Sequence, residues 1–79
     1  MQLKIYSLKK ILYEGEAKEV NLQTVVGELT ILDHHQPYIT AVKGGPVKII
    51  DQSDKMQVIE VESGFLEVKP GSDVRILAS

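Results

Sequence analysis

The chain has 79 residues, with nine Lys and Arg against eleven Asp and Glu, and it contains no cysteine. At roughly 100–200 residues per domain, this length predicts one domain spanning residues 1–79. The near-neutral charge disfavours a nucleic-acid binder, and the lack of cysteine excludes a disulfide framework or a thiolate metal site. No apolar run approaches the roughly 20 residues of a membrane span, and the first residues do not resemble a signal peptide.

The composition favours an all-β fold. Val and Ile number nine and eight, whereas Ala appears only three times. β-Branched side chains pack well on a pleated sheet, and Ala is the best helix former. Only one Phe, three Tyr and no Trp are present, so we expect an aliphatic core.

Short apolar runs separated by turn residues follow one another along the chain, a pattern typical of β-sandwiches and barrels. In chain order, the expected strands lie around Leu3 and Ile5, then at Ile11–Tyr13, Ala17–Leu22, Leu29–Leu32, Tyr38–Val42, Val47–Ile50, Met56–Val61, Phe65–Val68 and Val74–Leu77. Asp51–Asp54 and Pro70–Asp73 are expected turns, since Asp and Ser side chains bond the local backbone there. No segment sustains helical periodicity, so we predict no helix of three turns or more.

The apolar positions in these runs predict the core. The residues expected to be largely buried are Leu3, Ile5, Val20, Leu22, Leu29, Ile31, Ile39, Val47, Ile49, Val61, Phe65, Val68 and Ile76.

One short string could carry chemistry. Asp33-His34-His35 matches the letters of a metal-binding motif in the DHH phosphoesterases, which would make the chain a metal-dependent hydrolase. That chemistry needs several further Asp and His ligands, and these two His residues are the only ones here. Neighbouring residues on an extended strand also point to opposite faces. We therefore expect one His to pack in a loop and the other to be solvated, with no metal site.

The remaining candidates also have plain structural explanations. Gly44-Gly45-Pro46 is not followed by a helical pattern, so a tight turn is a better interpretation than a phosphate-binding loop. The acidic side chains of Glu14, Glu16 and Glu19 are expected to form a solvated face. The residues alone therefore show no catalytic site and indicate an interaction domain.

Residues 27–43, GELTILDHHQPYITAVK, resemble the pattern G-E-[FL]-x-[IV]-L-P-x-H-x-P-[LY]-[IL]-T-x-[LI]-K of the epsilon subunit of F-type ATP synthase. Residues 1–15 are similar to that family's opening, 62–68 to its S-G-G-F-L-E-V, and 74–78 to the following strand V-T-V-L-A. The resemblance covers essentially the whole chain. Two departures are that Asp33-His34 replaces the usual Pro-Gly and that Glu62-Ser63 replaces Ser-Gly.

The resemblance implies a flattened β-sandwich of about ten short strands in two sheets. It also implies a non-catalytic central-stalk subunit that joins the gamma subunit to the membrane c-ring and couples proton-driven rotation to ATP synthesis. Such a subunit lies peripherally at the cytoplasmic face of the energy-transducing membrane. It needs no cofactor, binds no nucleic acid and does not insert into the membrane.

Three partner-contact residues follow from the resemblance alone. Glu28 matches the family's glutamate near the polar loops of the ring, His35 matches a histidine near the same rotor contacts, and Ser7 matches the serine that faces the stalk partner. Longer family members continue as a C-terminal helical hairpin that carries ATP binding and inhibition. This sequence stops at Ser79, so we expect neither activity from it. The alternative from a different class is a free-standing β-sandwich module that binds a peptide or small ligand.

Overall fold

The computed structural model describes residues 1–79 and contains strands but no helix. The all-β prediction is confirmed, with nine strands where about ten were expected. Their bounds are β1 Gln2–Tyr6, β2 Ile11–Glu16, β3 Glu19–Thr24, β4 Gly27–Leu32, β5 Tyr38–Val42, β6 Gly45–Ile50, β7 Met56–Val61, β8 Gly64–Lys69 and β9 Asp73–Ala78. There is thus no helix long and apolar enough to cross a membrane.

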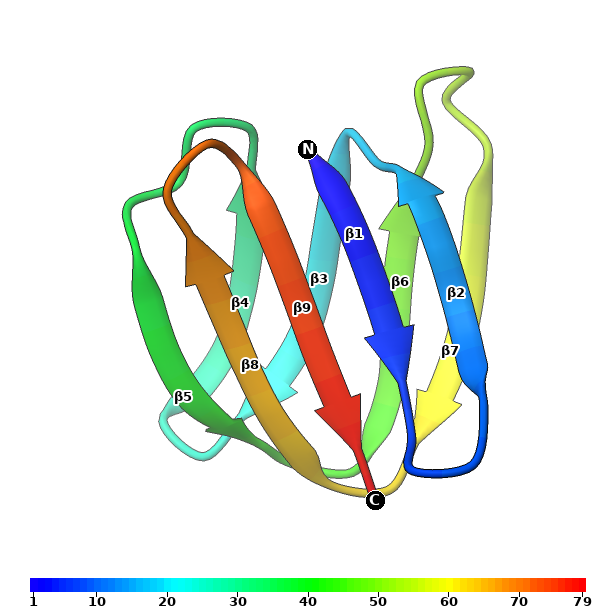
Figure 1. Cartoon of the computed structure of the whole chain (residues 1–79), viewed down its shortest axis with the longest axis vertical. Helices are drawn as coiled ribbons and strands as arrows, with labels where there is room; N and C mark the ends of the chain where they lie inside the picture. The colour runs from blue at the N-terminus through cyan, green and yellow to red at the C-terminus, as the bar shows by residue number, and fades with distance from the viewer.

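The strands form two layers (Figure 1). The first sheet, in front in Figure 1, has the order β2-β1-β9-β8-β5, and the second sheet behind it has the order β4-β3-β6-β7. The layers are joined at one side, where Thr24 of β3 pairs with Val42 of β5. β1 and β9 lie side by side as parallel strands, and the other pairings are antiparallel. The result is a sandwich that is almost closed into a barrel.

The core lies between the two sheets and is aliphatic, as expected. Ten of the thirteen predicted core residues are buried, and Leu29 is half-buried against the same cluster. The confirmed residues are Leu3, Ile5, Val20, Leu22, Ile31, Val47, Ile49, Val61, Val68 and Ile76. The prediction missed buried residues on the same strands, notably Val42, Leu66 and Val74.

Two core predictions are wrong, because successive residues of a strand face opposite sides of the sheet. On β8, Leu66 and Val68 face the core, so Phe65 faces outward and is 61% exposed. On β5, Ile39 pairs with Glu67 on the outer face and is 70% exposed. Phe65 and Val68 lie an odd number of positions apart and could not both point inward from one regular strand.

The two expected turns are confirmed. In the β6–β7 hairpin, Oδ1 of Asp51 accepts hydrogen bonds from the backbone N–H groups of Ser53 (2.8 Å) and Lys55 (3.0 Å). The β8–β9 turn contains Gly71 and Ser72, which both have positive φ angles.

Candidate protein-contact surfaces

Ser7 lies in the turn between β1 and β2 and its side chain organises that turn. Its hydroxyl oxygen accepts hydrogen bonds from the N–H groups of Lys9 and Lys10, both at 3.2 Å, and the hydroxyl donates to the carbonyl of Lys10 at 3.3 Å. These local bonds fix the backbone around Leu8, whose side chain is 95% exposed. The turn therefore presents an apolar side chain rather than the serine hydroxyl.

Glu28 lies on the outer face of the second sheet, near the turn between β3 and β4. Its carboxylate accepts a hydrogen bond of 3.1 Å from the side-chain amide of Asn21, which also donates to Thr30 at 2.9 Å. The side chain is otherwise exposed. The adjacent turn carries Val25 and Val26, which are 61% and 77% exposed. The Glu28 carboxylate, which is hydrogen-bonded to Asn21, thus lies near the exposed side chains of Val25 and Val26 at one end of the sandwich.

His35 lies in the loop between β4 and β5, at the opposite end of the sandwich from Ser7 and Glu28 (Figure 1). The ring Nδ1 is 2.7 Å from the carbonyl oxygen of Gln36. A carbonyl oxygen only accepts, so Nδ1 carries the hydrogen in this contact. The ring is half-buried and lies 6.1 Å from the ring of Tyr38, tilted by 60°.

The string Asp33-His34-His35 does not converge on one point. The Asp33 carboxylate binds the N-terminal ammonium group, and the N–H of His34 donates to the hydroxyl of Ser72 at 3.0 Å. No group of three or more His, Cys, Asp or Glu side chains is arranged to hold a metal ion. His34 has a φ of 65°, a left-handed conformation at the position where the resembling pattern has glycine.

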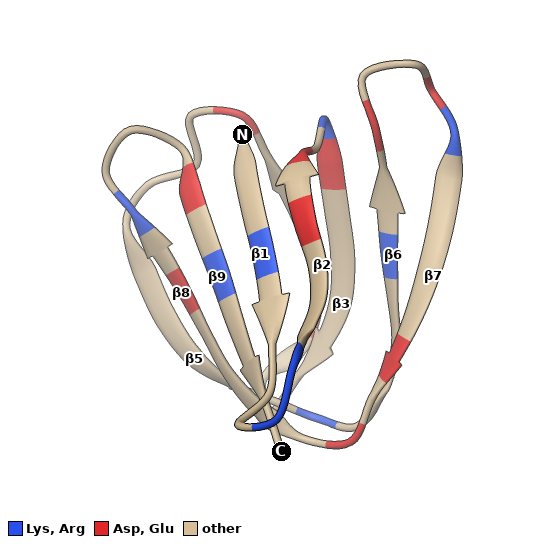
Figure 2. Cartoon of the chain, turned by 45° about the vertical axis from the view of Figure 1, so that its right-hand side comes forward, with Lys and Arg blue, Asp and Glu red and all other residues tan.

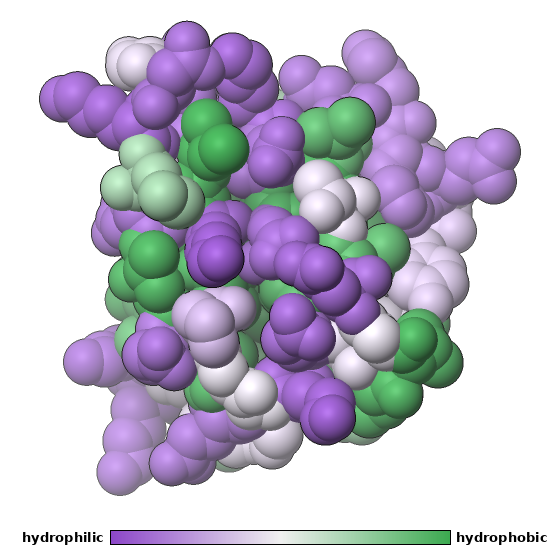
Figure 3. Space-filling model, turned by 180° about the vertical axis from the view of Figure 1, so that it is seen from behind, coloured by the Kyte–Doolittle hydropathy of each residue, from purple (hydrophilic) through white to green (hydrophobic).

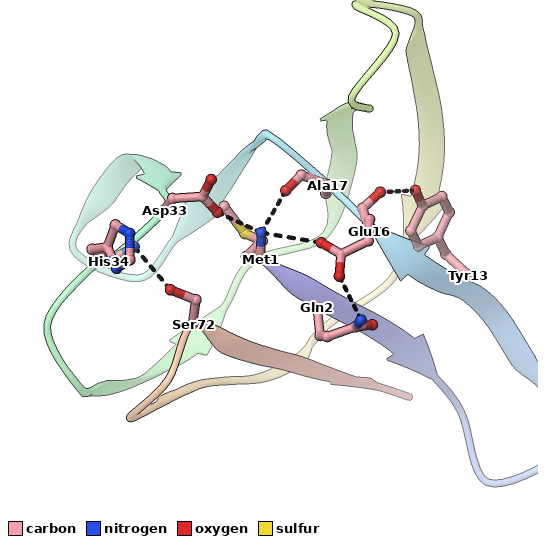
Figure 4. A network of polar contacts seen from close by, with 8 residues as sticks. All are labelled: Met1, Gln2, Tyr13, Glu16, Ala17, Asp33, His34 and Ser72. Atoms are coloured by element: carbon pink, nitrogen blue, oxygen red, sulfur yellow. Dashed lines mark hydrogen bonds and ion pairs between the residues drawn. The ribbon is translucent and has the colours of Figure 1, made fainter.

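The N-terminal ammonium group links three segments of the same end (Figure 4). It donates to the carbonyl of Ala17 at 2.8 Å, binds Oδ1 of Asp33 and lies 3.5 Å from Oε2 of Glu16. The hydrogen bond from the ammonium group holds the pKa of the Asp33 carboxyl below its ordinary value. Sequence reasoning missed this cluster, because Met1 and Asp33 lie 32 positions apart.

Exposed apolar side chains on the first sheet were also missed. Phe65 and Leu8, with Leu77, line a shallow hollow of about 210 Å³ beside the end of β9. Strict alternation along β8 would have indicated that Phe65 faces outward. That Leu8, Phe65 and Leu77 lie together depends on which strands are neighbours, which the sequence does not show.

The fold is that of a nine-stranded β-sandwich with two sheets. The family model of the ATP synthase delta/epsilon chain β-sandwich domain matches residues 1–79. The chain belongs to this family.

Curated relatives and solved structures agree with that placement. The ATP synthase epsilon chain of Bordetella parapertussis is 40% identical over 78 residues, covering 99% of this chain and 55% of the relative. The ATP synthase epsilon chain of Brevibacillus brevis is 35% identical over 78 residues, covering 99% of this chain and 58% of the relative. The chain thus spans somewhat more than half the length of these relatives.

Two solved assemblies contain chains of the same fold. A chain in the mitochondrial ATP synthase of Euglena gracilis, in a structure of OSCP, F1 and c-ring, superposes with a TM-score of 0.90 at 17% identity. The match covers 96% of this chain and 48% of that one. A chain in the central stalk and c-ring structure of the Tetrahymena thermophila mitochondrial ATP synthase superposes with a TM-score of 0.82 at 14% identity. This match covers 99% of the present chain and 62% of the Tetrahymena chain. At these identities the likeness concerns the fold.

Proposed function

We propose that this chain is a non-catalytic subunit of the central stalk of a proton-translocating ATP synthase. The observation that carries the proposal is the family match over residues 1–79, together with curated relatives that are ATP synthase epsilon chains. The structural neighbours are described as parts of F1/c-ring and central stalk/c-ring assemblies, which supports the same role. In this role the chain joins the gamma subunit to the c-ring, peripherally at the cytoplasmic face of the membrane.

The sandwich is suited to transmitting torque. A coupling element must hold its shape while force passes between two partners, and closely packed sheets resist deformation better than loops. Sixteen buried apolar residues form one cluster between the layers. The ammonium group of Met1 also ties β1 to the segments that precede β3 and follow β4. The chain couples rotation mechanically and contributes no reacting group.

The proposed contact surface runs along the edge strand β4. Glu28 at its beginning contacts the polar loops of the c-ring, and His35 beyond its end lies near the same rotor contacts. Ser7 in the β1–β2 turn faces the stalk partner, the gamma subunit. Six residues of β4 at about 3.3 Å per residue extend about 20 Å, which fits within a standard protein interface.

Site-specific crosslinking tests the ring contact. Glu28→Cys and Lys55→Cys both place an exposed thiol on a hairpin, and the two hairpins lie at opposite ends of the sandwich (Figure 1). Each variant is assembled into an ATP synthase that carries one cysteine in a polar loop of its c-subunit. Glu28→Cys should crosslink to the ring and Lys55→Cys should not. Intact assembly with equal crosslinking, or with none from Glu28→Cys, would contradict the proposed orientation. A chain that never assembles would favour a free-standing binding module.

A further inference from the structure

The amino group of Met1 lies inside the fold, where a charged group is costly unless it is paired. Met1 is 6% exposed and belongs to the apolar cluster between the sheets. Its backbone is bonded to Ala17 in both directions. The ammonium group donates to the carbonyl of Ala17 at 2.8 Å, and the N–H of Ala17 donates to the carbonyl of Met1 at 2.9 Å. Met1 is therefore held in place on both sides of its Cα atom, although it precedes β1.

The surroundings of this nitrogen match an ammonium ion. An ammonium group carries three N–H donors, no acceptor and one positive charge. It faces three acceptors, which are the carbonyl oxygen of Ala17, Oδ1 of Asp33 and, at 3.5 Å, Oε2 of Glu16 (Figure 4). The side chains of Asp33 and Glu16 are 45% and 53% exposed, whereas that of Met1 is fully buried. The terminal cation is thus the buried partner of two half-exposed carboxylates.

No other cation compensates these carboxylates. The ion pairs of the chain give neither Asp33 nor Glu16 a second basic partner. Lys18 follows Ala17 directly, but its ammonium group pairs with Asp54 of the β6–β7 turn. Figure 2 shows acidic segments of β2, β3 and β9 at the end of the sandwich where the N-terminus lies, while the basic segments of β1 and β9 lie further along these strands. Asp33 and Glu16 therefore depend on the terminal ammonium group for their counter-charge.

The contacts of Met1 join the two layers. Met1 leads into β1, and Glu16 ends β2, so both lie on the first sheet. Ala17 leads toward β3 and Asp33 follows β4, the strands of the second sheet. Seen from behind, the outer face of the second sheet is largely hydrophilic at its centre, with separate apolar areas toward the edges (Figure 3). The second sheet is thus held to the first through its inner face, and the Met1 contacts close one end of that interface.

An acyl group on this nitrogen would remove both the charge and the donors. Acylation converts the ammonium group into a neutral amide with one N–H in place of three. Hydrolysis of that amide consumes one water molecule and returns the ammonium group and a carboxylate. A hollow of about 310 Å³ lies beside the amine and is lined in part by Glu16, Asp33, His34 and Ser72. A group as small as formyl has space there, so its effect comes from the lost charge and donors.

We propose that the amino group of Met1 is an acylation-sensitive site, which ties the two sheets together only as a free ammonium group. A formyl or acetyl group on the nitrogen leaves Asp33 and Glu16 without their buried counter-charge, and one end of the sandwich loosens. This site does not depend on the proposed stalk role, because only contacts within the chain form it. An enzyme that adds or removes the acyl group controls the stability of the fold.

Chemical synthesis of the chain with three different amino termini tests the site. The termini are the free amine, the N-formyl amide and the N-methyl amine. A methyl group also adds bulk, yet the methylated nitrogen keeps its positive charge and two N–H donors. The N-formyl chain should melt about 5 °C or more below the free chain, because a buried cation has been removed from its partners. The N-methyl chain should melt much closer to the free chain.

Two further chains separate the local contact from general effects. A chain acetylated at the exposed side chain of Lys48, which makes no ion pair, also loses one positive charge and should melt like the free chain. In Asp33→Asn, formylation should lower the melting temperature by clearly less, because one charged partner of the ammonium group is already absent.

Equal melting temperatures of the free and N-formyl chains would overturn the proposal. Equal losses in the N-formyl and N-methyl chains would also overturn it, since bulk rather than charge would then be responsible. A loss of the same size on acetylation of Lys48 would assign the effect to net charge and would likewise contradict a site at Met1.

Discussion

The ammonium group of Met1 donates a hydrogen bond to Oδ1 of Asp33, which joins the residue before β1 to the loop after β4. The same ammonium group bonds the carbonyl of Ala17 before β3. This pair therefore connects the first sheet with the second at the end of the sandwich opposite Glu28 (Figures 1 and 4).

Asp33→Asn should destabilise the fold at neutral pH. The pKa of Asp33 is lowered in the folded state, so its contribution is present above the ordinary carboxyl pKa, about 3.9, and is lost as the pH falls through the folded value. Urea unfolding should show a lower midpoint for Asp33→Asn than for the unmodified chain at pH 7, with the difference shrinking as the pH falls below the ordinary carboxyl value of about 3.9. Asp54→Asn is the control, because the Lys18–Asp54 pair is exposed on both sides. Equal midpoints for the two variants at pH 7 would contradict the account.

Gly64→Ala should be strongly destabilising. A Cβ atom at this position would lie 1.9 Å from the backbone oxygen of Leu77 and 2.9 Å from its carbonyl carbon, where β8 begins beside β9. Backbone atoms cannot yield as a flexible side chain does, so we expect a loss of about 3 kcal/mol or more in the free energy of unfolding. Glu67→Ala on the same strand should change it by less than about 1 kcal/mol. A Gly64→Ala chain that melts like the unmodified protein would show that the two strands are further apart than described.

Substitutions at two adjacent residues of β8 should change the free energy of unfolding by very different amounts. Leu66 is fully buried, and Leu66→Ala should cost about 2–5 kcal/mol, enough to unfold much of so small a protein. Phe65 is exposed, so Phe65→Ser should change stability by only about 0.5 kcal/mol. Denaturant midpoints measured on both variants decide the matter. The reverse order of effects would place Phe65 in the core instead of on the outer face of the first sheet.

Residues 1–79 are not expected to bind ATP. Arg75 is the only arginine of the sequence, and its guanidinium group lies 3.4 Å from the carboxylate of Asp73. Isothermal titration of the chain with ATP and magnesium should give only the heat of dilution. Saturable binding in the micromolar range would overturn this expectation and indicate a nucleotide site on the sandwich itself.

The strands were predictable because turn residues divide the sequence into short β-branched runs, and that pattern is local. The direction of a side chain is also local, yet the prediction of a buried Phe65 rests on its place in an apolar run and on the scarcity of other apolar residues, and it overlooks the alternation with Leu66. The register between strands is not local. That Tyr6 lies beside Leu77, or Lys4 beside Arg75, depends on the parallel pairing of the two ends of the chain. These cross-strand neighbours and the Met1–Asp33 pair could therefore be recognised only in three dimensions.

The sequence resemblance identified the candidate contact residues, but it did not indicate what surrounds each of them in the fold. Ser7 was chosen for its serine, whereas the structure shows its hydroxyl engaged within the turn and Leu8 exposed beside it. Glu28 and His35 were expected at the two ends of one short strand, as parts of a single contact surface, and they flank the two ends of β4. Whether either residue touches a partner remains a prediction for the crosslinking experiment.

Reconstitution of proton pumping tests the central claim most directly. Membranes carrying an ATP synthase depleted of its epsilon subunit are supplied with this chain, and ATP-driven acidification of the vesicles is followed together with ATP hydrolysis. The account predicts that the chain sediments with the membranes and restores acidification without lowering the maximal rate of hydrolysis. A chain that stays in the supernatant, with acidification no higher than in the depleted membranes, would contradict it.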